Sequence, residues 1–462
     1  MNEYTYQDLL AVGDSDKNRI DFVRKSIQRH KSGEQYKTAV VAEDYMKKKN
    51  RTIAEYQKIL YRVTGEAVPD YSGANYKLYS GFYQRFVTQQ VAFSLGNGVK
   101  WEDESKANNA LGDNFDFVIY DAAVDAINGG VSYLFYNLDH VDEFSVKEFV
   151  PYTDEETGAL MAGVRYWQLE SDKPLRATLY EIDGYTEMEW TKDDGGKIIH
   201  DKRSYIIHYS GDAKDRAEDT MIVEGENYDG FPIVPLYANR FHQSEIVGIR
   251  EEIDAYDLLK SGYCNTVDEA SIFYWTIQNA GGMDETDLAR FVERMKTVHA
   301  SVMEDDGARA ESHTMEAPYQ SREAILAKIS ADLYRDFMSL DIAEIKGGAV
   351  TATQIEAAYE PMNLKADMFE GNILKALGGL MQLAGFEDAP TFQRSEIINK
   401  TEEIQNVIVA APHLPEDYVI EKILSILGDG DRSEEILNKM DADKIKRFEP
   451  MIDDGGNDNE DN

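Results

Sequence analysis

The chain has 462 residues, of which 42% are hydrophobic, and it carries 86 Asp and Glu against 48 Lys and Arg, a net charge of −38. This length predicts two to four subdomains, and the acidic charge argues against a protein that holds DNA or an anionic membrane by broad electrostatic attraction. A single cysteine, Cys264, excludes a disulfide framework and a CxxC metal site, which fits a reducing cytoplasm.

The N-terminal residues lack a basic segment followed by an apolar core, so we expect no signal peptide. No uncharged apolar run approaches the length of a membrane span. We therefore expect a soluble protein of intracellular origin with no membrane partner.

Helical patterns dominate the first 130 residues. Residues 16–62 are locally basic and predict helices. Their Lys47–Lys49 run is either a patch for DNA or an acidic partner, or the solvated end of a helix; the acidity of the remaining chain favours the solvated end. Residues 76–95 and 115–128 predict two further helices, the second of them stopped by Gly129.

Between about residues 130 and 240 the pattern changes to short runs rich in β-branched and aromatic residues. Turn clusters such as 193–196 separate these runs, which predicts an antiparallel sheet of hairpins. Pro232 and Pro235 keep the following segment extended. The predicted strands are VSYLFYNL, AGVRYWQLE, LRATLYEI, YTEMEW and SYIIHYS.

A first long helix is expected from Ser244, a candidate N-cap. Apolar residues follow at steps of three and four, which predicts one apolar stripe on a helix of roughly 30 residues, about 45 Å long. The stripe comprises Ile246, Ile249, Ile253, Tyr256, Tyr263, Val267 and Ala270.

Residues 276–318 predict a compact insertion. It contains a short helix, ETDLARFVERMKTV, and a hairpin, SVMEDDGARAESHTME, that turns at Asp305–Gly307. A second long helix follows the insertion, with one apolar stripe. That stripe comprises Leu326, Ile329, Leu333, Phe337 and Leu340.

A glycine-bearing joint separates the second helix from a third. Its residues are Ile345, Lys346, Gly347 and Gly348, and the pattern alone favours a helix end with Lys346 beside the C-terminal dipole. The third helix starts at a Thr351-x-x-Gln354 capping box and runs to about Leu383, with a kink expected near Pro361. Shorter helices are expected at 394–410, 416–427 and 433–447, before an acidic, disordered end.

Signals for catalysis are weak. The sequence has no GxxxxGK[ST], HExxH or GxSxG motif. His200 and His208 fall in the predicted sheet and could approach each other across a hairpin, but ordinary histidines are the simpler interpretation. The acidic run at 304–306 could in principle bind a divalent metal, but with 86 acidic residues such runs arise by chance, and this one falls at a predicted turn. The run at 429–431 lacks the later glycine and the final glutamate of a calcium loop, and Cys264 is expected to be buried and inert. No catalytic residue, metal site or cofactor is predicted.

The remaining signal is the arrangement of helices. Two antiparallel helices with an insertion at one end form a column that cannot cover its own apolar stripes, whereas a ring of such columns can.

Several stretches resemble the portal proteins of tailed bacteriophages, in particular the siphophage-type branch. The resemblance covers most of residues 20–430 and is carried by FPIVPLYANRFHQSEIVGIREEIDAYDLLKSGYCNTVDEAS, with Asn239 and the core 253–256, and by VTATQIEAAYEPMNLKADMFE. It implies a mainly helical α+β fold with an antiparallel sheet in the wing and long stem helices. The implied regions are 1–243 wing, 244–275 first stem helix, 276–318 clip, 319–341 second stem helix, 342–350 tunnel loop, 351–386 kinked helix, 387–447 crown and 448–462 disordered tail.

The resemblance also implies a function. It implies a non-enzymatic homo-oligomeric ring, a dodecamer, at the portal vertex of the capsid, through which double-stranded DNA is packaged, retained and ejected without sequence specificity. The implied partners are the terminase packaging motor, a head-tail adaptor, and the major capsid and scaffolding proteins. Ile345, Lys346, Gly347 and Gly348 would then line the channel, with glycines allowing movement and Lys346 contacting phosphates. Two alternatives are an acidic, metal-dependent nucleic-acid-processing enzyme and a helical interaction scaffold.

Overall fold

The structure is a computed structural model that divides into two compact units, each described by itself below. The first unit comprises Met1–Ser339 and Met362–Arg394, and the second comprises Leu340–Pro361 and Ser395–Asn462. The described residues are 4–13, 15–61, 64–71, 75–191, 195–209, 222–270, 274–278, 284–297, 309–313, 319–345, 352–395, 400–428, 432–433, 436–437 and 439–440.

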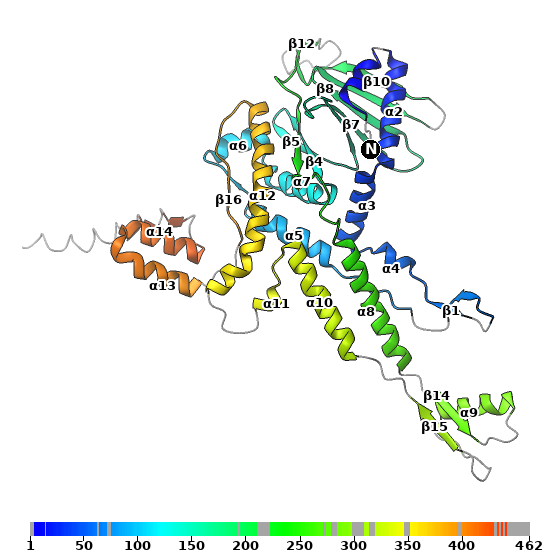
Figure 1. The fold of residues 1–462 in the computed structure, drawn as a ribbon. Helices are drawn as coiled ribbons and strands as arrows, with labels where there is room; N and C mark the ends of the chain where they lie inside the picture. The colour runs from blue at the N-terminus through cyan, green and yellow to red at the C-terminus, as the bar shows by residue number, and fades with distance from the viewer. Residues whose placement is uncertain are drawn as a thin grey trace, which may run out of the picture. The chain divides into compact units, whose positions relative to one another are not determined.

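The N-terminal helices of the first unit follow the sequence prediction closely (Figure 1). The prediction for residues 16–62 is confirmed for its helices, although the segment ends in strand β1 (Ile59–Tyr61). The helices before the sheets are α1 (Tyr6–Ala11), α2 (Asp16–Ser32), α3 (Glu34–Met46), α4 (Arg51–Glu55), α5 (Phe82–Leu95), α6 (Glu104–Leu111) and α7 (Phe115–Gly129).

The predicted antiparallel sheet is confirmed, but it forms two main sheets. One is five-stranded, in the order β10-β9-β8-β7-β6, and the other is three-stranded, in the order β13-β4-β5. Their strands are β4 (Val131–Asn137), β5 (His140–Ser145), β6 (Phe149–Thr153), β7 (Leu160–Trp167), β8 (Leu175–Glu181), β9 (Gly184–Trp190), β10 (Lys197–Arg203) and β13 (Ile233–Tyr237). Short pairs are β1 with β2 (Ala67–Pro69), β3 (Val99–Lys100) with β16 (Thr391–Phe392), and β11 (Ile206–Tyr209) with β12 (Ile222–Glu226).

Helices cover each main sheet with apolar side chains. Val23 and Ile27 of α2 are buried in one cluster with Val164 and Trp190 of the five-stranded sheet. Helix α7 packs on β4 and β5, and its Ile119 and Ile127 are fully buried. Burying such side chains stabilises the fold by about 25 cal/mol for each Å² of apolar surface removed from water.

His200 and His208 do not approach each other across a hairpin, which agrees with the simpler interpretation of ordinary histidines. His200 lies in β10, which pairs with β9, and His208 lies in β11, which pairs with β12 in a separate sheet. Each histidine instead has a glutamate neighbour across its own pair, Glu187 for His200 and Glu226 for His208.

The first long helix, α8 (Arg250–Ala270), begins six residues later than expected and has 21 residues. Gly248 has a φ of 89°, which breaks the helical path before Arg250. Ser244 caps a preceding turn, because its Oγ accepts a 3.3 Å hydrogen bond from the Ile246 backbone N–H. Cys264 in α8 is half-buried instead of buried.

The insertion after α8 contains the expected helix, α9 (Glu285–Thr297), but its strands pair differently from the prediction. β15 (Arg309–His313) pairs antiparallel with β14 (Tyr274–Gln278), which lies on the far side of α9 in sequence. The predicted turn at 305–307 lies outside the described residues.

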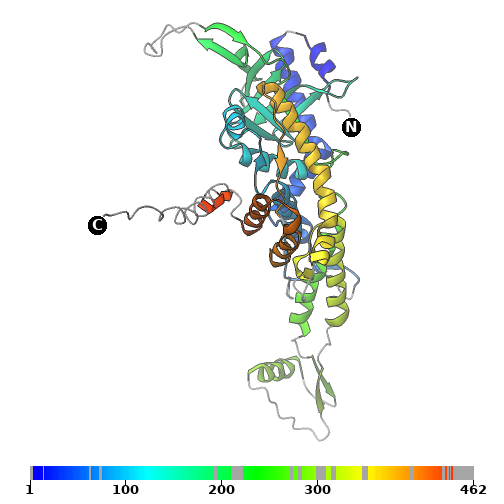
Figure 2. The same ribbon diagram turned by 90° about the vertical axis from the view of Figure 1, so that its left-hand side faces the viewer.

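The second and third long helices are α10 (Tyr319–Phe337) and α12 (Ala352–Ala384). Helices α8 and α10 run next to each other as a hairpin (Figures 1 and 2). The second unit contains α11 (Ile342–Ile345), the start of α12, α13 (Lys400–Ala410) and α14 (Glu416–Leu427). The expected segment 433–447 is described only in part, and the acidic end is not described.

Candidate functional site

The four residues of the predicted channel loop are only partly described. Ile345 is the last residue of α11, whereas Lys346, Gly347 and Gly348 lie outside the described residues, as does the capping residue Thr351. Pro361 lies inside α12, and the division between the two units falls directly after it. The channel role of the loop and the kink at Pro361 therefore stay predictions.

A hairpin of α8 and α10 forms the centre of the candidate site. Arg322 Nη1 of α10 donates a 2.7 Å hydrogen bond to Thr266 Oγ1 of α8, and the rings of Tyr263 and Tyr319 meet edge to face at 5.9 Å. Phe337, at the end of α10, stacks on Phe86 of α5 at 4.8 Å. The hairpin is thus fixed to the body at one end and braced along its length.

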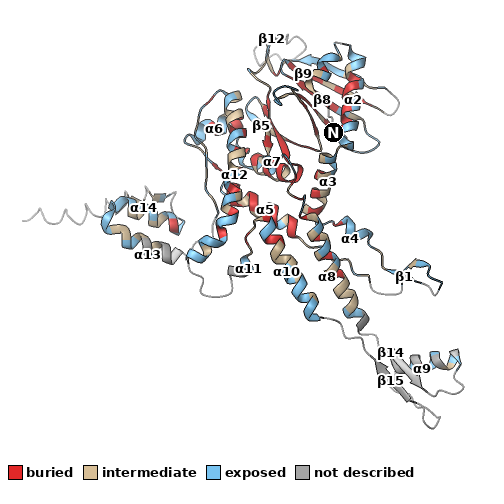
Figure 3. Cartoon of the chain, viewed as in Figure 1, coloured by how far each residue is buried: buried red, intermediate tan, exposed pale blue. Residues whose placement is uncertain are grey.

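The expectation that the two helices cannot cover their own apolar stripes is wrong for the part of the hairpin next to the body, where Ile246, Ile249, Ile253, Leu333 and Phe337 are buried in the core of the first unit. Other apolar side chains of the hairpin are not covered by the described part of the chain. Leu258 and Val267 of α8 are 40% and 43% exposed, and Ile325 of α10 is 45% exposed. Figure 3 shows buried positions concentrated in the body, with intermediate and exposed positions along the hairpin. Leu258 and Val267 are nine residues apart, which places them on opposite sides of α8, so the exposed side chains do not form a single patch. Exposed apolar side chains on more than one side of a helix hairpin indicate surfaces that other molecules cover.

Helix α8 is also tied to the segment that precedes α5. Asp257 is fully buried and accepts hydrogen bonds from Asn50 Nδ2 at 3.0 Å and from the Ser80 N–H at 2.9 Å. One and two turns further on, Ser261 Oγ accepts from the Leu78 N–H at 3.0 Å, and Asn265 Oδ1 accepts from the Tyr76 N–H at 2.7 Å. This polar row at steps of four was available in the sequence as a signal that the prediction missed.

Lys365 of α12 joins three parts of the first unit. Its Nζ lies 3.0 Å from Glu245 Oε2, donates a 2.9 Å hydrogen bond to the Phe337 carbonyl and sits 3.3 Å from the centre of the Phe337 ring. Burial lowers the pKa of Lys365, and Glu245 opposes that shift. The lysine therefore caps the C-terminal end of α10 with positive charge and holds α12 against it.

Arg394 contacts the same part of α12 that contains Lys365. Its Nη2 pairs with Glu370 at 2.7 Å and with Asp367, and its Nη1 donates to Asn363 Oδ1 at 3.1 Å. The hydrogen bond with Glu370 is the largest cause that raises the pKa of Arg394. Asn363, Asp367 and Glu370 follow one another at steps of four and three, which places them on one face of α12, so one arginine clamps a single face of the helix.

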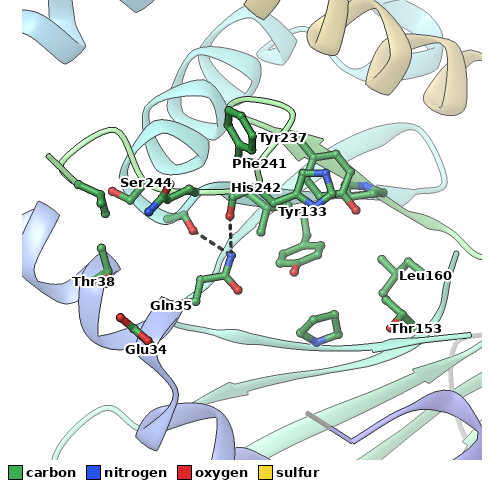
Figure 4. Close-up of a pocket in the computed structure, with 16 residues that line it drawn as sticks. Glu34, Gln35, Thr38, Tyr133, Thr153, Leu160, Tyr237, Phe241, His242 and Ser244 are labelled. Carbon is green, nitrogen blue, oxygen red and sulfur yellow. Dashed lines mark hydrogen bonds between the residues drawn. The ribbon is translucent and has the colours of Figure 1, made fainter. Parts of the chain in front are cut away.

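A recess of about 480 Å³ lies between α3, the three-stranded sheet and the loop before α8 (Figure 4). Gln35 Nε2 donates to the Gly129 carbonyl at 3.1 Å and to the His242 carbonyl at 3.5 Å. The His242 ring stacks on Tyr237 at 3.7 Å, and burial lowers the pKa of His242. These contacts hold the loop of residues 238–249 against the body. The side chains that make them do not pair a nucleophile with a general base.

Two half-buried carboxylates interact on the body, Asp125 of α7 and Glu143 of β5. Burial, and then the charge of Asp125, raise the pKa of Glu143 to about 8. The folded state therefore binds a proton that the unfolded chain releases near pH 4, so this group's contribution to stability falls as pH rises from about 4 to 8.

We expect Glu143→Gln to raise the free energy of unfolding at pH 8 by on the order of 1 kcal/mol, with a smaller gain at pH 5, because the amide needs no proton to stay neutral. Urea unfolding of both proteins at the two pH values measures this difference. Glu170→Gln, at an exposed position after β7, is the matched control and should change little. An equal gain for Glu143→Gln at both pH values would show that Glu143 is not protonated in the folded state.

Within the part of the chain that the structure describes, no group of three or more His, Cys, Asp or Glu is arranged to hold a metal ion. In the same residues, no helix is long and apolar enough to cross a membrane. The polar contacts of the described site join helices and loops to one another, so these side chains hold the fold together.

The comparisons with known proteins identify the family. The chain belongs to the phage portal protein family of the SPP1 Gp6-like type, which it matches over residues 25–444. This confirms the resemblance to the siphophage-type portal proteins and the mainly helical α+β fold. The chain is thus a portal protein, a structural protein of the portal vertex of a phage particle.

Individual relatives agree with the family. The chain is 23% identical over 398 residues to the portal protein of Bacillus phage SPP1, covering 80% of this chain and 75% of that protein. It is 23% identical over 301 residues to the portal protein of Clostridium phage phiCD119, covering 61% of this chain and 63% of the relative's length.

Solved structures give weaker likenesses. Two of them are the neck of a native gene transfer agent particle computed with C12 symmetry, with a TM-score of 0.43, and the neck of an empty particle computed with C6 symmetry, with a TM-score of 0.45. Both are 12% identical to this chain and cover 75% of it, with 89% and 90% of the respective neighbour covered.

Proposed function

We propose that copies of this chain close into a homo-oligomeric ring, a dodecamer, whose central channel carries double-stranded DNA during packaging, retention and ejection. The observation that carries the proposal is the exposed apolar surface of the α8–α10 hairpin, on Leu258, Val267 and Ile325. A ring covers this surface with the next copy of the hairpin, and a single chain leaves it in water. A net charge of −38 keeps DNA from adhering to the wall of such a channel.

We assign the regions of the proposed ring subunit as the sequence predicts. Residues 1–243 form the wing and 387–447 the crown, and the hairpin of 244–275 and 319–341 forms the stem. The clip, 276–318, faces the terminase packaging motor and then the head-tail adaptor, while capsid and scaffolding proteins surround the wing. Assembly takes place in the host cytoplasm, and the ring then becomes the portal vertex of the virion.

The loop of residues 342–350 lines the narrowest part of the proposed channel. Ile345, Lys346, Gly347 and Gly348 project from every subunit, and Lys346 supplies a ring of positive charge for DNA phosphates. Pro361 bends α12 beside this loop, because proline removes one backbone hydrogen bond and clashes with the preceding turn.

Lys346→Ala is expected to leave ring formation intact and to lower the amount of DNA packaged or retained several-fold, because each subunit loses one phosphate contact. Ring formation is measured by mass photometry, and packaged DNA is measured by quantitative amplification from nuclease-treated particles. Lys375→Ala makes the same change of charge on an exposed position of α12 and serves as the control. If Lys346→Ala instead prevents the subunit from folding, Lys346 caps a helix and does not serve the channel.

A further inference from the structure

A segment between α4 and α5 exposes an unusual number of aromatic side chains. We call residues 56–79 the arm; it contains the β1–β2 pair. Tyr61 is 75% exposed and Tyr71 is 85% exposed. The other exposed large side chains of the arm are Tyr56, Ile59, Tyr76 and Tyr79. Large apolar side chains exposed in this number indicate an interaction site.

Hydrogen bonds join the two strands of the arm and attach one end of the arm to α8. Gln57 Nε2 donates to the Asp70 carbonyl at 3.2 Å, which ties the two strands of the arm together. The returning end of the arm is held on α8 by the hydrogen bonds to Ser261 and Asn265 described above. The arm projects from the side of α8 that faces away from α10 (Figure 1).

A groove lies elsewhere on the same unit, between the loop of residues 238–249, the end of α10 and α12. Its volume is about 670 Å³. Phe241 and Met368, which line it, are 70% and 66% exposed, and Val247 adds further exposed apolar surface. The groove is therefore an apolar recess that the described part of its own unit leaves open.

The segment that leads into the arm and the segment beside the groove carry opposite net charges. Residues 47–62 contain six Lys or Arg and one Glu, of which Lys47 and Arg51 pair with Glu43 and Asp44. Residues 244–257 contain five Asp or Glu and one Arg; of these acids, Glu245 pairs with Lys365 and Asp257 is fully buried. Asp336 lines the groove and lies next to Glu252, and burial and then Asp336 raise the pKa of Glu252. Basic groups from another molecule would relieve this repulsion between neighbouring carboxylates.

We propose that the arm of one subunit packs into the groove of its neighbour, with aromatic side chains of the arm against Phe241, Val247 and Met368. Because arm and groove are two different surfaces, the contact is head-to-tail, which is the type of contact that generates a closed ring. The inference rests on the proposed ring and names one contact that would hold it together.

Disulfide trapping in the full-length chain tests this contact. In a Cys264→Ser background, one cysteine is placed on the arm (Tyr61→Cys or Tyr71→Cys) and one in the groove (Phe241→Cys or Met368→Cys), which gives four pairs. Oxidation of the assembled protein should give a ladder of covalent oligomers on a non-reducing gel for at least one pair. The control pairs each arm cysteine with Leu169→Cys, which is 84% exposed between β7 and β8 and should give no ladder.

Mass photometry of the same samples before oxidation separates the two proposals. Rings without a ladder from any of the four pairs would overturn the arm contact and leave the ring standing. A disulfide within one chain, seen as a monomer of altered mobility, would show that the arm fills its own groove and would also overturn the contact. The absence of rings would overturn the ring and this contact together.

Discussion

Replacing Lys365 by alanine is expected to lower the free energy of unfolding by about 3 to 5 kcal/mol. The substitution leaves Glu245, whose side chain is 19% exposed, without its cation, and it leaves the Phe337 carbonyl without a donor. It also removes the ammonium group from the face of the Phe337 ring. Urea unfolding, followed by circular dichroism, measures the loss.

Two controls separate the buried ion pair from other effects of the substitution. Lys365→Met combined with Glu245→Gln removes both charges and keeps similar volumes, so it should be less destabilising than Lys365→Ala alone. Lys375→Ala removes an exposed lysine from the same helix and should change stability by less than about 0.5 kcal/mol. A similar small effect for Lys365→Ala would show that α12 is not held to α10 through this side chain.

Gly130→Ala is expected to destabilise the protein by about 3 kcal/mol or more, because two costs add. Gly130 has a φ of 84°, a left-handed conformation that alanine adopts at a cost of about 1 kcal/mol. A Cβ atom at Gly130 would also overlap the backbone carbonyl of His242, so the loop of residues 238–249 would have to move.

Gly158→Ala is the matched control for this prediction. Gly158 has a φ of 69°, and a Cβ atom there would meet nothing within 4 Å. It therefore carries the conformational cost without the overlap, and we expect a loss of about 1 kcal/mol. Thermal unfolding gives the loss of stability of each variant, and the difference between the two losses is the cost of the overlap between a Cβ atom at Gly130 and the loop of residues 238–249. Equal losses would mean that the loop moves away at no cost.

The sequence predicted those elements whose signals are local. Runs of aromatic and β-branched residues predict the strands β4, β7, β8 and β9 directly. The spacing of apolar residues predicts the helix α10 in the same way. The start of α8 was misplaced because Gly248 reads as an ordinary helical glycine until its φ is known. Boundaries of this kind depend on backbone conformation that composition does not reveal.

Contacts between distant segments were the main omission. Nothing near residue 365 in sequence shows that this lysine pairs with Glu245 and contacts the end of α10. Likewise, the sequence of β15 does not show that it pairs with β14, which precedes α9 in the chain. Burial of a charged side chain is decided by the segments that surround it. The recognisable stretches around 231–271 and 350–370 identified the family, whereas these contacts emerged only from the structure.

The most direct test of the account is a reconstruction of the purified assembly by electron cryomicroscopy, viewed down its axis. We predict a closed ring in which Leu258, Val267 and Ile325 are covered by the neighbouring subunit and residue 346 faces the lumen. A monomer that covers these three side chains within its own chain, or a ring whose residue 346 points away from the lumen, would contradict it.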